Sequence, residues 1–177
     1  VSLFQAGRQE KAIKYYSEVL KRDHNDSYAC YEKGHTLSSL GKYEEAIECF
    51  DKAIEFDAKL AHAWYNKGYA LNLLGRQDEA IICFQQVIEY YQNSLIKNGK
   101  DPAAWNYKGV AHDDLKQYEE AIECFEKAIE LDPKNADAYR NKGYSLGNQT
   151  KYEEAIECFD KAIELDPKNA DAYRNKG

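Results

Sequence analysis

The sequence has no methionine and only 3 prolines and 10 glycines among 177 residues. It lacks the ~20 consecutive apolar residues that a transmembrane helix needs, so we expect no contact with a membrane. It has no basic excess either, and its net charge of -7 argues against nucleic acid as the main partner. A phosphate-binding loop, a nucleophile elbow and a zinc-binding helix motif are all missing. These absences predict a protein that is not an enzyme and needs no metal or cofactor.

What the sequence does have is an internal repeat, and its length of 177 is five periods of 34 residues plus 7. Alanines recur 34 residues apart, with one interval of 41, at Ala12, Ala46, Ala80, Ala121 and Ala155. An aromatic residue follows each alanine by four positions, at Tyr16, Phe50, Phe84, Phe125 and Phe159. A small residue, Ala or Val, comes three positions later. Spacings of four and three place these side chains on one face of a helix.

A second helical stripe precedes the first in each period. It contains a large residue, a glycine four positions on and, in most periods, an apolar residue three further, and its glycines are Gly34, Gly68, Gly109 and Gly143. A glycine inside a helix costs about 1 kcal/mol relative to alanine. Its recurrence therefore predicts a contact too close for a larger side chain. Between the two stripes, Gly41 and Gly75 are expected to form tight turns.

Each period thus predicts an antiparallel helix pair that buries its apolar face by stacking on its neighbours. Residues 63–68 (AWYNKG) and 118–122 (YEEAI) resemble the two signature segments of the tetratricopeptide repeat family. The resemblance implies an all-α, right-handed solenoid of five 34-residue periods with one 7-residue insertion. We divide the chain into a partial repeat (1–26), repeats 27–60, 61–101, 102–135 and 136–169, and a partial repeat (170–177).

The insertion, residues 95–101, is close to two helical turns, so the second helix of its repeat can lengthen without rotating its apolar face. Asn98 and Gly99 are expected to end this helix. Asp101 and Pro102 are expected to cap and begin the next one. The extension would protrude from one rim, where it either contacts a partner or is a tolerated insertion.

Charged residues also follow the period. Where the family usually has leucine, this chain has Lys33, Lys67, Lys108, Lys142 and Lys176, and we expect their stems to pack between helices with the ammonium groups in water. Glutamates four positions before a lysine should form ion pairs within the second helices: Glu48 with Lys52, Glu123 with Lys127, and Glu157 with Lys161.

Four of the five cysteines, Cys49, Cys83, Cys124 and Cys158, share one column of the repeat. Equivalent atoms of stacked helix pairs should lie about 10 Å apart, too far for a disulfide. We interpret these cysteines as small buried hydrophobic residues and predict a reducing, cytoplasmic location. His112 takes an apolar position and is expected to be a hydrogen-bonded core histidine.

The resemblance implies that the first helix of each repeat lines a concave groove that binds an extended peptide or a partner helix. The candidate groove residues are Tyr31, His35, Tyr65, Asn66, Tyr69, Asn106, Tyr107, Arg140, Asn141, Tyr144, Arg174 and Asn175. Tyrosine offers large rigid contact area, and asparagine amides can hold a peptide backbone. We expect about half of the groove tyrosines to pack between helices instead.

The predicted function is therefore a scaffold for a protein or peptide ligand. Arg140 and Arg174 predict a preference for acidic or C-terminal carboxylate groups. Arg140 and Asn175 match two positions of a carboxylate clamp found in some family members, but Tyr144 replaces its asparagine, so a full clamp is not predicted. Two alternatives stay open: the repeat region of a larger enzyme such as a protein glycosyltransferase, and a structural solenoid that self-associates head to tail. The second rests on Gly177 falling in the column just before Val1.

Overall fold

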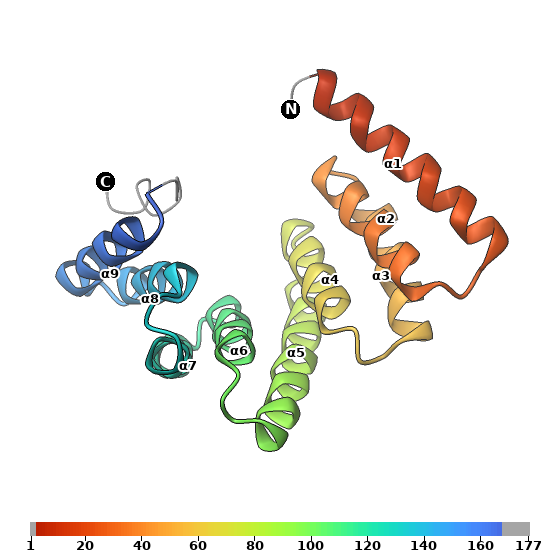
Figure 1. The fold of residues 1–177 in the computed structure, drawn as a ribbon. Helices are drawn as coiled ribbons and strands as arrows, with labels where there is room; N and C mark the ends of the chain where they lie inside the picture. The colour runs from red at the N-terminus through yellow and green to blue at the C-terminus, as the bar shows by residue number, and fades with distance from the viewer. Residues whose placement is uncertain (1–2, 168–177) are drawn as a thin grey trace. The chain divides into compact units, whose positions relative to one another are not determined.

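The computed structural model describes residues 3–167 and contains nine α-helices and no strand within that range. The helices are α1 (Leu3–Arg22), α2 (Ser27–Ser39), α3 (Tyr43–Phe56), α4 (Ala61–Leu73), α5 (Gln77–Lys97), α6 (Pro102–Asp114), α7 (Tyr118–Leu131), α8 (Ala136–Asn148) and α9 (Tyr152–Leu165) (Figure 1). After α1, helices α2 to α9 follow one another as four pairs, each with a first and a second helix. This confirms an all-α solenoid of helix pairs.

The chain divides into two compact parts, which we describe separately. The N-terminal part is residues 1–87 and the C-terminal part is residues 88–177, so α5 begins in one and ends in the other. In the N-terminal part α2 packs on α3 and also contacts α1 and α4. In the C-terminal part α6 packs on α7 and α8 packs on α9, while α7 and α6 both contact α8.

In each described helix pair, a glycine of the first helix packs against a phenylalanine of the second helix. A Cβ atom added to the glycine would lie 2.6–2.9 Å from a ring carbon of that phenylalanine, closer than side chains tolerate. The four pairs are Gly34 with Phe50, Gly68 with Phe84, Gly109 with Phe125, and Gly143 with Phe159. All four phenylalanines are buried. The predicted close contact at the mid-helix glycines is therefore confirmed.

Neighbouring helices complete the core of each pair. Phe50 and Ala53 of α3 form a buried cluster with Ala63 of α4, and Ile13 and Leu20 of α1 pack against it. A helix pair thus hides its apolar face only when further helices stack upon it, as the repeat pattern predicts.

The turns between paired helices use a left-handed residue in every repeat. Gly41 and Gly75 have φ of 77° and 76°, as expected for glycine after a helix. In the next two repeats Lys116 and Thr150 take the same conformation, with φ of 60° and 63°. The hydrogen bonds are equivalent: Lys151 N donates to Leu146 O at 3.0 Å, and the same bond recurs in the other three turns. The turn geometry is therefore kept even where glycine is missing.

The insertion lengthens α5 as predicted. This helix has 21 residues, against 14 in α3, α7 and α9, and it ends at Lys97, just before Asn98. The Asp101 carboxylate then caps α6 by accepting bonds from Ala103 N and Ala104 N. The extension is partly integrated into the C-terminal part, since Leu95 is buried while Ile96 is 73% exposed.

Three of the lysines that recur with the period, Lys67, Lys108 and Lys142, make contacts that were not predicted from the sequence. Lys67 Nζ lies 2.6 Å from Asp51 Oδ1 and Lys142 Nζ lies 2.7 Å from Glu126 Oε1, in each case across to the preceding second helix. Lys108 instead donates to the neutral amide of Gln92 at 2.6 Å. These three ammonium groups are thus paired rather than left to water, and they connect one repeat to the next.

The ion pairs expected within the second helices are wrong in their spacing. Lys127 pairs with Glu130 at 2.7 Å and Lys161 with Glu164 at 2.8 Å, three residues ahead rather than four behind. Residues three and four apart are both neighbours on a helix, so each lysine has an acidic residue on either side. Its one ammonium group takes the partner that follows it.

The cysteines match their predicted role as small hydrophobic residues. All five are free thiols; Cys30, Cys83 and Cys124 are buried, and Cys49 and Cys158 are half-buried. Burial raises the pKa of Cys83 and of Cys124 to about 11. No helix within the described residues is both long and apolar enough to cross a membrane.

Candidate functional site

The candidate groove residues of the N-terminal part lie on α2 and α4. Tyr31 and Tyr65 are half-buried, with ring centroids 6.2 Å from Phe50 and 5.8 Å from Phe84. The Asn66 amide donates to the Tyr31 hydroxyl at 3.2 Å and so bridges the two first helices. These tyrosines anchor the groove face to the core rather than projecting from it.

Two other predicted residues of this part face solvent. His35 is exposed and its ring stacks on Tyr31 with centroids 6.2 Å apart. Tyr69, one turn after Tyr65, is 47% exposed. We call the solvent-facing sides of α2 and α4, and of α6 and α8 in the C-terminal part, the groove faces.

The C-terminal part repeats the bridge with different residues. Asn141 Nδ2 of α8 donates to Asn106 Oδ1 of α6 at 3.1 Å, from the same repeat position as Asn66. Tyr107 and Tyr144 are 43% and 52% exposed. The structure therefore brings Asn106 and Asn141 together across the two first helices and leaves Tyr107 and Tyr144 facing solvent.

Two further contacts shape this groove face. The guanidinium group of Arg140 lies 3.1 Å from the carboxylate of Asp137, one turn earlier on α8. Tyr107 stacks on Tyr91 of the extended α5, with centroids 5.4 Å apart. The lengthened helix therefore contacts Tyr107, a candidate groove residue, and the sequence alone did not indicate this contact. The remaining predicted residues, Arg174 and Asn175, lie outside the described residues.

One buried polar pair was not predicted from the sequence. Ser145 is fully buried and donates a hydrogen bond to the Asp113 carboxylate on the neighbouring first helix. Burial raises the pKa of Asp113, and the bond from Ser145 partly offsets this shift. A signal was present, because Ser145 occupies a column that holds Ala70 and Ala111 in the two preceding repeats. A polar residue in a column of buried alanines indicates a specific partner.

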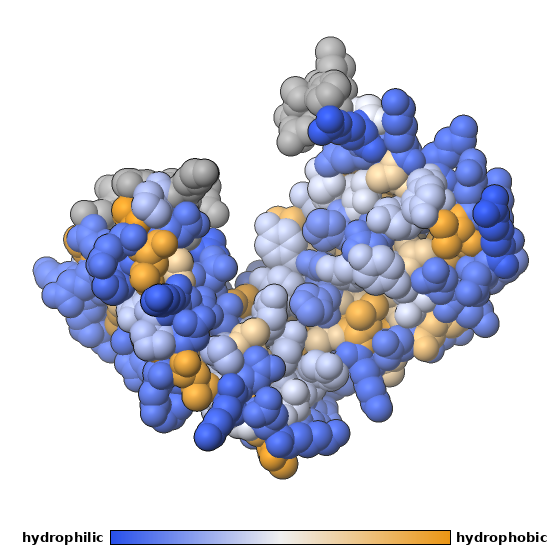
Figure 2. Space-filling model, viewed as in Figure 1, coloured by the Kyte–Doolittle hydropathy of each residue, from blue (hydrophilic) through white to orange (hydrophobic). Residues whose placement is uncertain are grey.

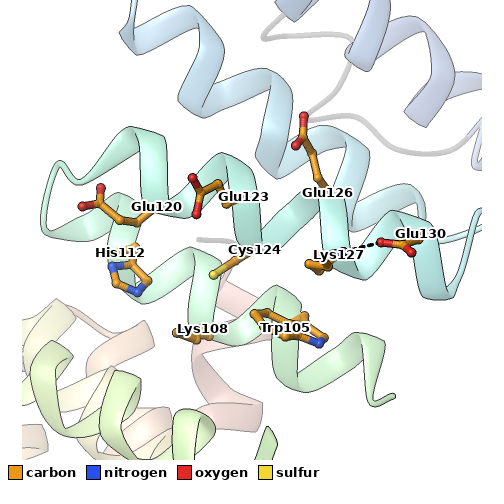
Figure 3. Close-up of a pocket in the computed structure, with 9 residues that line it drawn as sticks. All are labelled: Trp105, Lys108, His112, Glu120, Glu123, Cys124, Glu126, Lys127 and Glu130. Carbon is orange, nitrogen blue, oxygen red and sulfur yellow. Dashed lines mark hydrogen bonds and ion pairs between the residues drawn. The ribbon is translucent and has the colours of Figure 1, made fainter. Parts of the chain in front are cut away.

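A separate cleft of about 530 Å³ opens between α6 and α7 (Figure 3). Its walls are Trp105, Lys108 and His112 from α6, and Glu120, Glu123, Cys124, Glu126, Lys127 and Glu130 from α7. Lys108 Nζ lies 5.3 Å from the centre of the Trp105 ring. Since Lys127 bonds Glu130 and Glu126 bonds Lys142, much of the cleft's charge is already paired within the chain.

His112 departs in part from its prediction. Its Nδ1 lies 2.8 Å from Gln117 Oε1, so it is hydrogen-bonded as expected. The ring is half-buried and lines the cleft, however, rather than filling the core. Across the described residues, no cluster of histidine, cysteine and acidic side chains has an arrangement that could hold a metal ion.

Comparison with known sequences defines the class of protein. A model of the tetratricopeptide repeat matches residues 61–94, 102–135 and 136–169, and a second model, of the TPR repeat, matches residues 34–75. The chain belongs to the tetratricopeptide repeat family. This repeat is a scaffold for protein interaction. A search of curated proteins gave no match.

Solved structures agree with this assignment. A crystal structure of MamA is 29% identical and covers 93% of this chain and 92% of that one, with a TM-score of 0.61. MamA from Desulfovibrio magneticus RS-1 is 27% identical, with coverages of 94% and 90% and a TM-score of 0.62. TTC0263, a thermophilic TPR protein of Thermus thermophilus, is 18% identical, with coverages of 98% and 91% and a TM-score of 0.72. The last of these similarities concerns the fold alone.

Proposed function

We propose that the chain is a non-catalytic scaffold that binds an extended peptide or a partner helix on its groove faces. The observation that carries this proposal is the pair of amide bridges, from Asn66 to Tyr31 and from Asn141 to Asn106. These bonds hold neighbouring first helices in register. A surface fixed in this way loses little conformational entropy when a ligand binds.

The exposed tyrosines supply the contact area. Tyr69, Tyr107 and Tyr144 are each 43–52% exposed, and each is large and rigid. Covering such rings with a ligand removes apolar surface from water, while the hydroxyl groups remain able to bond a peptide. On the face that Figure 2 shows, hydrophobic residues form only small, separate patches.

Within this function we propose that Arg140, with Arg174, favours acidic or C-terminal carboxylate groups of the ligand. The Arg140 side chain is 27% exposed and is held by Asp137, whose side chain is 66% exposed. Guanidinium groups bind carboxylates through two parallel hydrogen bonds. A ligand carboxylate would share the Arg140 guanidinium with Asp137.

Selection from a phage-displayed library of random dodecapeptides tests the proposal. We expect selected peptides to bind about tenfold more weakly to Tyr144→Ala and to Arg140→Ala than to the wild type. Lys134→Ala, which removes an equal charge from an exposed turn, is the control and should change nothing. Peptides that lose affinity on Trp105→Ala but not on Tyr144→Ala would contradict the proposal, because they would bind the α6–α7 cleft.

The carboxylate preference has its own test. Each selected peptide is measured with a free C-terminus and with a C-terminal amide. A preference for the free acid that disappears in Arg140→Ala supports the assignment. Equal affinity of the acid and the amide, in peptides without other acidic residues, overturns it.

A further inference from the structure

A carboxylate lies among aromatic side chains where α1 meets α2, helices that contact each other in the N-terminal part (Figure 1). The carboxylate is that of Glu32 on α2. The hydroxyl groups of Tyr16 and Tyr28 lie within hydrogen-bonding reach of it. The ring of Tyr31 lies 6.4 Å from Tyr28, and His35 stacks on the same Tyr31 ring. We call the set Tyr16, Tyr28, Tyr31, Glu32 and His35 the Glu32 cage.

The negative charge of the cage is not neutralised by a basic side chain of the described part of the chain. Within residues 3–167 no lysine or arginine forms an ion pair with Glu32. Its neighbour Thr36 bonds the Glu32 backbone oxygen and leaves the carboxylate alone. The phenol groups of Tyr16 and Tyr28 lie near the carboxylate but carry no charge. Their hydroxyls stay protonated: the bond to Glu32 raises the pKa of Tyr28, and burial, followed by the Glu32 charge, raises the pKa of Tyr16.

The cage is open to ligands. Tyr28 is 63% exposed, and Tyr15, which meets Tyr16 edge-on at 5.4 Å, is 62% exposed. Glu32 itself is half-buried, so the residue is partly accessible to solvent. Aromatic ring faces attract cations, and a carboxylate beside them adds a full opposite charge.

The carboxylate is specific to one repeat. The residues that correspond to Glu32 in the following repeats are Asn66, Tyr107 and Asn141, none of which is charged. Asn66 and Asn141 use this position to bridge first helices, whereas Glu32 faces tyrosine hydroxyls instead. The net charge of -7 would also draw a basic ligand toward the chain.

We propose that the Glu32 cage binds a lysine or arginine side chain of the partner peptide. The cation would sit against the Tyr28 and Tyr31 rings with its charge toward the Glu32 carboxylate. This proposal rests on the peptide-binding function proposed above and adds a chemical requirement at the N-terminal part. Arg140, in the C-terminal part, calls for a ligand group of the opposite sign.

Small probes test the cage without any peptide. Wild-type protein is titrated with the N-acetyl amides of arginine and lysine, and binding is followed by NMR shifts of the tyrosine rings. The neutral analogues, citrulline and Nε-acetyl-lysine amides, are titrated in parallel. We expect saturable binding of the two cations, about fivefold or more weaker in Glu32→Gln, and none of the neutral analogues. Equal binding of charged and neutral probes would overturn the proposal.

Glu48→Gln is the matched control, because it removes the same charge from an exposed position of α3. If both variants weaken the probes equally, net charge rather than the cage attracts them, and the proposal fails. Tyr28→Phe, which keeps the ring and removes the hydroxyl, serves as a second variant should Glu32→Gln lose its helical circular dichroism. It should retain most of the probe affinity, since the ring face and the carboxylate remain.

The same variants separate this inference from the proposed function. Arg140→Ala should leave the probes unaffected. If the cations bind but the peptide library yields nothing, the cage stands and the groove proposal falls. If the library yields groove-binding peptides whose affinity is unchanged in Glu32→Gln, and the probes do not bind, the cage alone is wrong.

Discussion

The interior of each helix pair and its groove face obey different rules. In the interior, a glycine faces a phenylalanine in all four described pairs. A Cβ atom added to that glycine would lie within 2.9 Å of the phenylalanine ring. On the groove face, one position holds Tyr31, Tyr65, Asn106 and Arg140 in successive repeats. The interior is uniform because one packing solution must serve every pair. The groove face varies because its contacts differ from repeat to repeat: the Tyr31 and Tyr65 rings lie against phenylalanines, whereas Asn106 accepts a hydrogen bond from Asn141.

Substitutions in the interior should therefore change stability, and those on the groove face should change binding. Substituting an interior phenylalanine should give the largest change in stability. Phe125→Ala should lower the free energy of unfolding by about 3–5 kcal/mol, because it leaves a cavity against Gly109. Tyr144→Ala, on the groove face of the same part, should change it by less than about 0.5 kcal/mol. Urea denaturation followed by circular dichroism measures both. Similar losses in the two variants would abolish the distinction.

Two glycines of α8, one turn apart, give the next largest effect. A Cβ at Gly143 would lie 2.7 Å from the Phe159 ring, so Gly143→Ala should cost about 1–3 kcal/mol. Gly147 has nothing within 4 Å, so Gly147→Ala should stabilise by up to about 1 kcal/mol through helix propensity. Urea denaturation measures the change in the free energy of unfolding for both variants. A change of the same sign in both would refute the close-contact interpretation.

The interior thiols predict a loss of stability at high pH. Because burial raises the pKa of Cys124 to about 11, the unfolded chain releases this proton first as the pH rises above 9. The thiol's contribution is fully present below pH 9 and is lost as the pH approaches 11, about 1 kcal/mol by pH 10. Comparing the free energy of unfolding of the wild type and of Cys124→Ala at pH 8 and pH 10 separates the thiol's contribution from that of other titrating groups. An identical pH dependence of the two proteins would show that the thiol is not desolvated.

The turns give the smallest effect. Thr150 has φ of 63°, a conformation that β-branched residues rarely adopt, so Thr150→Gly should stabilise by about 0.5–1 kcal/mol. The gain is reduced by the greater chain entropy of glycine in the unfolded state. Gly75→Thr is the reverse experiment and should destabilise. Thermal melts that rank Thr150→Gly below the wild type would be evidence against strain at this turn.

The parts of the fold that recur with the period could be predicted from the sequence. Gly109 and Phe125 were recognisable because their types repeat, and the length of α5 followed from a seven-residue insertion. The left-handed turns at Lys116 and Thr150 could not be recognised, because the glycine that marks such a turn is missing there. Conformation at these positions is imposed by the packed helices on either side.

The groove face was predictable only in outline. Neighbouring positions such as Tyr65 and Asn66 differ by about 100° around the helix. The sequence places both near the groove but does not decide which of the two side chains packs on Phe84. The bond from Ser145 to Asp113 depends on the register between two first helices, which the sequence of either helix does not contain. Such contacts need the coordinates of both helices.

A double substitution on the groove faces separates ligand binding from folding within one protein. Tyr69→Ser/Tyr144→Ser removes one exposed ring from each part and leaves every glycine–phenylalanine contact in place. Its free energy of unfolding and its affinity for library-selected peptides are measured on the same sample. We expect a change in the free energy of unfolding below about 1 kcal/mol and an affinity at least about tenfold lower. A folded variant that keeps its affinity, or a variant that unfolds, would contradict this expectation.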